Sequence, residues 1–287
     1  MQIGNREAIS IRIPGGPDWL AADDEHVYIM RDEGGVDVLD PATGAVLSSI
    51  ELTGHRCQGL GAADGSLWAC SGADERSELF RLDPTTGDIE ARVATTKAYE
   101  QGHLIIGFGR VWVLLGDGSS MVGIDLNTNA PGEPIPLPIR GTDLALGSDG
   151  VWVVSAVDNA AVEVDPDRGV AGRLVEGLDR ARVAVEVPGA LWVGGAVASY
   201  RVDLATSAVT ATVDGGVGTD GGISADAGGI WVRKGGVTLQ HLDAATGAII
   251  EEISAEIGTG GDILVAFDAV WVSFHNDATL LRIPLSY

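Results

Sequence analysis

The pentapeptide GVWVV at Gly150–Val154 decides the fold, because close relatives of it recur along the whole chain. Each relative has an aromatic residue at its centre, flanked mostly by apolar residues. The relatives are HVYIM (His26–Met30), SLWAC (Ser66–Cys70), RVWVL (Arg110–Leu114), ALWVG (Ala190–Gly194), GIWVR (Gly229–Arg233) and AVWVS (Ala269–Ser273). Successive central residues lie 40, 44, 40, 40, 39 and 40 residues apart. Seven anchors at a period of about 40 residues indicate a repeat protein, and this period is typical of β-propellers.

A second motif keeps step with the first. It reads LDPATG at Leu39–Gly44 and recurs at 82–87, 164–169 and 242–247, with weaker forms at 124–129 and 202–207. Its aspartate and glycine are typical of a tight turn, because the carboxylate can accept backbone hydrogen bonds and glycine tolerates positive φ. In the fourth repeat, short runs rich in β-branched residues at 143–148, 150–155, 160–165 and 171–176 predict four strands.

The repeated tryptophan is explained by packing between sheets. A four-stranded sheet cannot bury both faces alone, so the predicted sheets stack side by side around an axis, and one large ring per sheet fills the wedge between neighbours. The last repeat lacks its fourth strand, whereas Ala8–Gly16 resembles the fourth strand of the first repeat. We therefore predict an all-β, seven-bladed propeller over residues 1–287 as one domain, closed by residues 8–14 pairing with the last blade.

Composition narrows the classes of partner. The formal net charge is −23, and such a surface repels nucleic acid and anionic membranes. The N-terminal ten residues lack the pattern of a signal peptide, and no apolar run is long enough to cross a bilayer. We expect a soluble, monomeric protein in the cytoplasm, or a secreted protein if a leader was removed.

The two cysteines, Cys57 and Cys70, flank a predicted hairpin turn at Ala62–Gly65. They could face each other across its two strands and form a disulfide bond. In a cytoplasm, two reduced and buried thiols are the expected state instead. The sequence leaves both states open.

The combined motif pattern resembles that of streptogramin-lyase-like and YVTN-type seven-bladed propellers over nearly the whole chain. This resemblance implies a propeller fold. It also implies two classes of function, because the family includes a lyase that opens a cyclic depsipeptide by magnesium-assisted elimination as well as binding or scaffold proteins. In the lyase, an acidic residue follows shortly after the repeated tryptophan. The third residue after each anchor here is Arg31, Ser71, Leu115, Ser155, Gly195, Lys234 or Phe274, none of which is acidic. The resemblance therefore carries over the fold rather than the magnesium site.

Polar residues recur where each innermost strand should begin, at the mouth of the axial channel. One such residue per blade is found: Asp18, Gln58, His103, Asp143, Arg182, Asp220 and Asp262. Loops between the second and third strands add Arg31, Asp32, Arg233, Lys234, His275 and Asn276. Half of the 18 basic residues fall in loops predicted at this face, which suggests a local positive region for an anionic or polar ligand.

Two interpretations of these residues stay open. Each has an ordinary structural role: the aspartates and His275 as turn or strand caps, the basic side chains as partners of nearby carboxylates, and His103 as a partner of its own loop. As a site, His275 would transfer a proton or donate a hydrogen bond, Asp262 and Asp18 would orient it or hold Mg²⁺ or Ca²⁺, and Arg233 and Arg31 would bind an anion. Further ligand contacts are predicted for Asp220, His103, Asp143, Arg182 and Trp19.

The function predicted from these features is binding of a small molecule or a protein partner at the mouth. The alternative is a lyase or isomerase that uses the histidine and carboxylates of the same funnel. No zinc-binding spacing and no nucleotide-binding or serine-hydrolase motif is present in the sequence.

Overall fold

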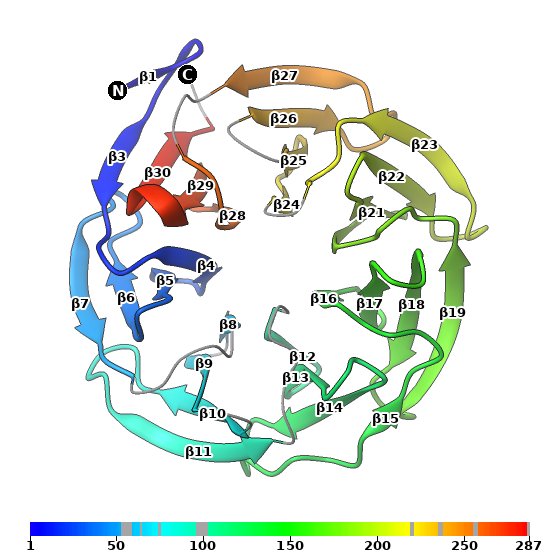
Figure 1. The fold of residues 1–287 in the computed structure, drawn as a ribbon, viewed down its shortest axis with the longest axis horizontal. Coiled ribbons are helices and arrows are strands. Elements are labelled where there is room, and N and C mark those ends of the chain that lie inside the picture. The colour runs from blue at the N-terminus through cyan, green and yellow to red at the C-terminus, as the bar shows by residue number, and fades with distance from the viewer. Residues whose placement is uncertain are drawn as a thin grey trace.

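The computed structural model is a closed ring of seven antiparallel four-stranded sheets (Figure 1). It describes residues 1–52, 59–63, 65–73, 76–95, 103–218, 221–234, 238–254 and 258–285. No helix in these ranges has the length and hydropathy needed to span a bilayer. The predicted all-β, seven-bladed architecture is confirmed.

Each of the first six blades is built from four consecutive strands, the first of which lies nearest the axis (Figure 1). From the inside outward, blades 1 to 3 are β4 (Pro17–Ala22), β5 (Val27–Arg31), β6 (Val36–Leu39) and β7 (Val46–Ile50); β8 (Leu60–Ala63), β9 (Ser66–Ala73), β10 (Arg76–Leu82) and β11 (Ile89–Thr95); and β12 (Ile105–Gly107), β13 (Arg110–Leu115), β14 (Ser120–Asp125) and β15 (Ile135–Pro136).

Blades 4 to 6 follow the same order: β16 (Asp143–Leu146), β17 (Val151–Ser155), β18 (Ala160–Asp165) and β19 (Val170–Glu176); β20 (Val183–Val187), β21 (Ala190–Gly194), β22 (Ala198–Asp203) and β23 (Val209–Asp214); and β24 (Ile223–Ala225), β25 (Gly229–Arg233), β26 (Thr238–Asp243) and β27 (Ile249–Ser254). Blade 4 agrees closely with the four strands predicted for the fourth repeat.

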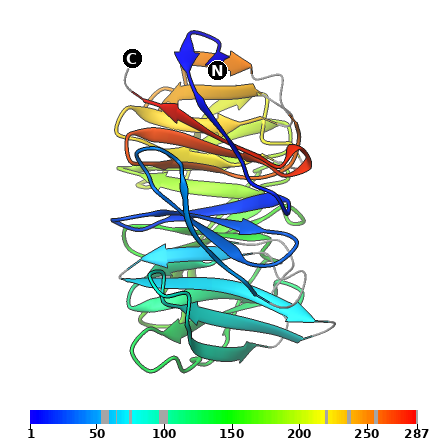
Figure 2. The ribbon, with the colours of Figure 1, turned by 90° about the vertical axis from the view of Figure 1, so that its left-hand side faces the viewer.

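The last blade closes the ring with a strand from the N-terminus. Its first three strands are β28 (Ile263–Ala266), β29 (Ala269–Phe274) and β30 (Thr279–Pro284), with the 3-10 turn η1 (His275–Asp277) between the last two. The outer strand is β3 (Ile9–Arg12), which pairs antiparallel with β30 from Ile9 opposite Arg282 to Arg12 opposite Thr279. Figure 2 shows this strand crossing the edge of the last blade before the chain enters blade 1. The predicted closure is confirmed.

A short hairpin before β3 strengthens this closure. Its strands are β1 (Gln2–Ile3) and β2 (Arg6–Glu7). The Arg6 guanidinium lies 2.8 Å from Glu251 of blade 6 and donates hydrogen bonds to the carbonyl oxygens of Pro284 and Leu285 after β30. Ile3 is buried in the apolar cluster that joins blades 6 and 7. The hairpin therefore holds blades 6 and 7 together next to the closing strand.

The six repeated tryptophans are buried, none more than 1% exposed, as predicted. Trp192 shows why, since it packs against Val217, Ile230 and Val232 of the following segment and blade, and its indole N–H donates to the Ala244 carbonyl of blade 6 at 3.0 Å. Each such ring supplies apolar area between two sheets. The indole N–H is hydrogen-bonded in Trp112, Trp152, Trp192, Trp231 and Trp271, whereas that of Trp68 has no partner among the described residues. The repeat is thus a packing device.

The second motif forms the outer turns of the blades. In the first, the Asp40 side chain accepts hydrogen bonds from the backbone N–H groups of Ala42 and Thr43, which lower its pKa, and Gly44 has a φ of +74°. Where the motif is weaker, Asn129 and Ser207 take the same left-handed conformation, with φ of +58° and +60°. The aspartate therefore organises the turn even without glycine.

Cys70 takes part in a disulfide bond, and the described residues contain no free cysteine. Cys57, the other cysteine of the sequence, lies outside the described residues. The bonded state that the sequence left open is thus the one found for Cys70.

Candidate functional site in the propeller mouth

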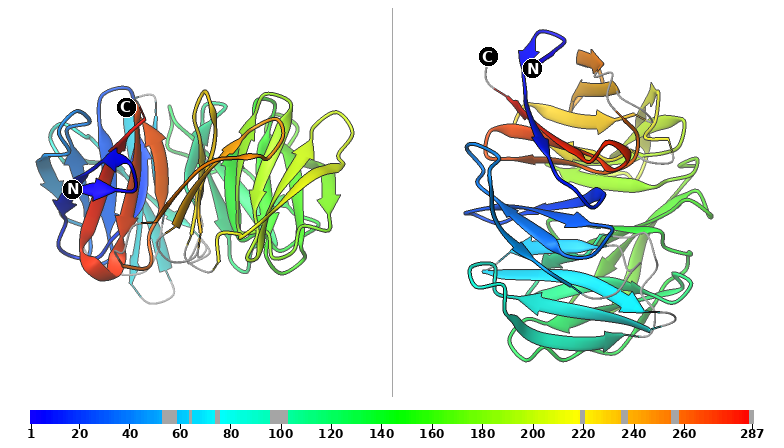
Figure 3. Two further views of the ribbon diagram at one scale, coloured as in Figure 1. Left: turned by 90° about the horizontal axis from the view of Figure 1, so that it is seen from above. Right: turned by 60° about the vertical axis from the view of Figure 1, so that its left-hand side comes forward.

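A cavity of about 510 Å³ opens at one end of the axial channel. Its walls come from the starts of inner strands and from the loops between second and third strands, as predicted for the mouth. The 3-10 turn η1 belongs to this face, on the opposite side of the disc from the C-terminus (Figure 3). The lining includes Asp18, Trp19, Asp32, His103, Thr142, Asp143, Ala156, Val157, Arg180, Arg182, Val183, Asp262, His275 and Asn276.

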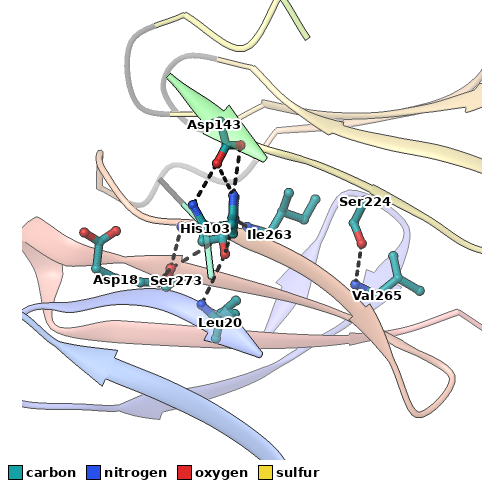
Figure 4. A network of polar contacts seen from close by, with 9 residues as sticks. Asp18, Leu20, His103, Asp143, Ser224, Ile263, Val265 and Ser273 are labelled. Carbon is teal, nitrogen blue, oxygen red and sulfur yellow. Dashed lines mark hydrogen bonds and ion pairs between the residues drawn. The ribbon is translucent and has the colours of Figure 1, made fainter. Parts of the chain in front are cut away.

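His103 forms the floor of this cavity by bridging the channel. Its ring Nδ1 lies 2.9 Å from both carboxylate oxygens of Asp143 on the neighbouring blade, and its backbone N–H donates to the same carboxylate at 2.7 Å. On the other side, Nε2 lies 3.5 Å from a carboxylate oxygen of Asp262 in blade 7. Figure 4 shows His103 beside the Asp143 carboxylate. One imidazole therefore connects blades 3, 4 and 7.

The charged form of His103 fits this position. Burial disfavours the imidazolium, but the charge of Asp143 and its hydrogen bond, followed by the contact with Asp262, raise the pKa of His103 well above its usual value. Both ring nitrogens can then donate to carboxylates. The ring also meets Trp19 edge to face, with centroids 4.4 Å apart. The floor is consequently fixed by charge and by packing.

Asp262 is 7% exposed, and hydrogen bonds hold its carboxylate in place. Its carboxylate accepts hydrogen bonds from the backbone N–H groups of Leu20 in blade 1, at 3.1 Å, and of Ile263, at 2.7 Å. Its own N–H donates to Ser273, whose hydroxyl donates to the Asp18 carbonyl (Figure 4). These bonds tie blade 7 to blade 1 and leave Asp262 little freedom to rearrange.

Asp18 differs from its neighbours because its carboxylate makes no hydrogen bond or ion pair with any described residue. Burial, then the negative charges of Asp32 and Asp262, raise the pKa of Asp18 to about 7, although His275 and Arg233 oppose the shift. A carboxyl group that titrates near neutrality inside a cavity can accept or release a proton at physiological pH. Asp18 is therefore a group of the cavity that can exchange a proton with a ligand near neutral pH.

His275 stands at the rim and is paired with Asp32. Its Nε2 lies 2.7 Å from the Asp32 carboxylate and its Nδ1 is 3.2 Å from the side-chain oxygen of Asn276. Partial burial disfavours the charged imidazolium, but the hydrogen bond with Asn276 and the negative charge of Asp32 raise the pKa of His275. Both ring nitrogens are thus occupied. Asp32, rather than Asp262 or Asp18, orients this histidine.

Basic and apolar side chains form the opposite wall. Arg180 and Arg182 come from the segment between β19 and β20, and Ala156 and Val157 follow β17. The backbone N–H of Arg180 donates to Asn159, and its φ of +45° is in the left-handed region. Its guanidinium makes no ion pair with any described residue. This wall offers a positive group next to an apolar surface.

The remaining predicted residues lie elsewhere. The side chain of Arg31 pairs with carboxylates of its own blade, and its guanidinium lies 2.7 Å from Glu51 and 3.4 Å from Asp37. Arg233 is 1% exposed, donates to the Gly260 carbonyl at 2.8 Å and stacks over the Phe274 ring. Neither lines the cavity. Asp220 and Gln58 lie outside the described residues.

Two charged residues of the cavity lining, Asp32 and Arg180, were missing from the predicted site. Asp32 was predicted only as a residue of a mouth loop, and Arg180 belongs to the half of the 18 basic residues that were predicted in loops at this face. A signal existed for Asp32, because the RDEGG loop at 31–35 places an acidic residue next to the axis in the blade that follows His275 in the closed ring. Arg180 had no distinguishing signal, since its position depends on a left-handed backbone.

The residues of the mouth do not form an evident metal centre. Within the described ranges, no group of three or more histidine, cysteine, aspartate or glutamate side chains is placed to hold a metal ion. Asp262 and Asp143 instead share a histidine as their counter-charge. The donors that were candidates for Mg²⁺ or Ca²⁺ are thus partly occupied by protein groups.

Comparison with known proteins places the fold. Neither a protein-family model nor a curated protein sequence matches the chain. Among solved structures, "Streptogramin B lyase structure" matches 96% of this chain and 97% of that chain with a TM-score of 0.77 and 14% identity. BamB from Moraxella catarrhalis matches over 93% and 84%, with a TM-score of 0.65 and 15% identity. The chain therefore shares a propeller fold with these solved structures, as its sequence resemblance implied.

Proposed function

We propose that this propeller binds a small polar molecule in the mouth cavity. The observation that carries the proposal is Asp18, a carboxyl group that has no hydrogen-bond or ion-pair partner among the described residues and faces a cavity of about 510 Å³. Cavities of this size, with a few convergent polar groups, are typical of small-molecule sites. A protein partner is the less favoured ligand, because the ionisable groups lie inside a concave cavity rather than on an exposed apolar patch.

The test is a screen of a few hundred polar fragments by saturation-transfer NMR. Fragments that bind the native protein should lose their signal with Asp18→Asn and with Arg180→Gln. They should keep it with Asp24→Asn, a control that changes an exposed aspartate outside the cavity lining. Binding that is equal in all four proteins, or an absence of binders, would refute the proposal.

A second candidate function is acid–base catalysis of a lyase or isomerase type. It is favoured by the pKa of about 7 for Asp18, which suits a general base at neutral pH. Asp18, rather than His275, would then take the proton, since both ring nitrogens of His275 already face protein oxygens. Once a substrate is known, Asp18→Asn should lower kcat by a factor of about 10²–10⁴. Retained turnover in that variant would rule out this role.

The cellular location is also a proposal. Disulfide bonds persist in oxidising compartments and are rare in the cytosol. The bonded state of Cys70 therefore favours the secreted alternative over the cytoplasmic location that composition predicted. Thiol titration of the denatured protein, purified without reductant, should find no free thiol, and two thiols per chain would support the cytoplasmic prediction.

A further inference from the structure

Apart from Asp143 of blade 4, which is paired with His103, the carboxylates and guanidinium groups of the cavity are divided between two walls. Asp18 and Asp32 of blade 1 and Asp262 of blade 7 lie on one side, and Arg180 and Arg182 precede blade 5. Blade 1, with β4, and blade 5, with β21, stand on opposite sides of the ring (Figure 1). A ligand that fills the cavity therefore meets carboxylates at one end and guanidinium groups at the other.

Protein groups already compensate most of the charges. His103 is the counter-charge of Asp143 and Asp262, and His275 is that of Asp32. The Asp18 carboxylate is left without a direct partner among the described residues. An ammonium group is the ligand group that best satisfies a carboxylate in a partly buried site, because it supplies both charge and hydrogen-bond donors.

On the other wall, the Arg180 guanidinium is left without an ion pair among the described residues. A guanidinium matches a carboxylate in shape and can hold it through two parallel hydrogen bonds. Trp19, next to Asp18, and Ala156 and Val157, on the wall of Arg180, offer apolar surface to the body of a ligand.

We propose that the cavity selects a small zwitterion, of the size of a dipeptide, whose ammonium group faces Asp18 and whose carboxylate faces Arg180. This inference rests on the proposed function and specifies the ligand class of that site. A simple anion would leave Asp18 buried under the ligand without a donor, and a simple cation would leave the guanidinium unmatched. Either mismatch weakens binding, because desolvated polar groups need partners.

The test uses the twenty free dipeptides Gly-Xaa, with one standard residue at Xaa, and the same compounds acetylated at the N-terminus or amidated at the C-terminus. Affinities are measured by isothermal titration calorimetry. We expect the best free dipeptide to bind at least tenfold more tightly than either blocked form. In Asp18→Asn the penalty for acetylation should disappear, whereas in Arg180→Gln the penalty for amidation should disappear. Asp24→Asn and Arg168→Gln, which change exposed residues outside the cavity lining, should keep both penalties.

The outcomes separate this inference from the proposed function. If the polar fragments bind in a way that depends on Asp18 and Arg180, but free dipeptides bind no better than blocked ones or do not bind, the cavity is a ligand site and the zwitterion is wrong. If neither fragments nor dipeptides bind, the proposed function is wrong as well. Loss of both penalties in the control variants would also overturn the inference, since the selectivity would then not arise from these two residues.

Discussion

At the residue scale, Asp18 is buried beside two negative neighbours, Asp32 and Asp262. This environment makes the free energy of unfolding depend on pH. The pKa of Asp18 is 3.8 when the group is exposed and about 7 in the folded protein. Between these values the folded chain keeps a proton that the unfolded chain releases, so the free energy of unfolding falls as the pH rises from about 4 to 7. Above pH 7, the folded protein holds a charged Asp18 carboxylate that has no direct partner among the described residues.

Asp18→Asn should remove this cost. We expect the variant to match the native protein near pH 4 and to exceed its free energy of unfolding by about 2–4 kcal/mol at pH 8, because one pKa unit corresponds to about 1.4 kcal/mol. Denaturant unfolding at several pH values measures the difference, with Asp24→Asn as the control. A constant difference across the pH range would contradict the account.

His103 provides the opposite case. Its pKa is raised in the folded state, so its contribution to stability is full below pH 6.5 and is lost as the pH rises through the raised value. His103→Ala leaves Asp143 and Asp262, 3% and 7% exposed, without their shared counter-charge. Removing one partner of a buried ionic group typically costs about 3–5 kcal/mol. Thermal and denaturant unfolding at pH 6 should show a loss of this order, and a loss below about 1 kcal/mol would mean that the bridge is not structural.

At the scale of single elements, β3 is the strand on which the ring depends. Deleting residues 1–14 should expose the outer edge of β30, lower the free energy of unfolding by several kcal/mol and promote aggregation. Deleting residues 1–7 instead removes only the β1–β2 hairpin and keeps the closing strand. This shorter deletion should cost less and leave the protein monomeric by light scattering. Equal behaviour of the two deletions would show that β3 is not the decisive closure.

The tryptophans give a second test of the blades. Six of them are at most 1% exposed and pack between sheets, whereas Trp19 lines the cavity. Acrylamide should therefore quench only a minor, accessible part of the fluorescence of the folded protein. Trp19→Phe should remove most of that part. Efficient quenching of most of the emission in the native protein would mean that the tryptophans are not buried between blades.

The elements could be predicted from the sequence because each depends on short-range pattern. Strand boundaries follow alternation and turns, and the anchor at Trp152 or Trp192 repeats at a constant spacing. The closing strand could be predicted because the last repeat has sequence for only three of the four strands of a blade. The site was only partly predictable. The inner-strand starts located Asp18, His103, Asp143 and Asp262, but not which of them touch. That depends on the width of the channel, which lets His103 reach across to blade 7, and on backbone conformations such as that of Arg180.

At the scale of the whole molecule, charge and shape act together. The chain has a net charge of −23, yet one end of its channel gathers Arg180, Arg182 and two histidines whose pKa values are raised. An acidic exterior repels simple polyanions, whereas a mouth that carries four aspartates as well as these positive groups can attract a small molecule with charges of both signs. The ring is closed by β3, so the proposed selectivity depends on the side chains of the mouth.

The most direct test of the central claim is a crystal structure of the protein soaked with its strongest-binding fragment or dipeptide. The account predicts electron density inside the mouth cavity, with ligand atoms within hydrogen-bonding distance of the Asp18 carboxylate and the Arg180 guanidinium. Density at another surface, such as the groove between blades 1 and 2 beside Asp24, with the mouth cavity holding only water, would contradict it.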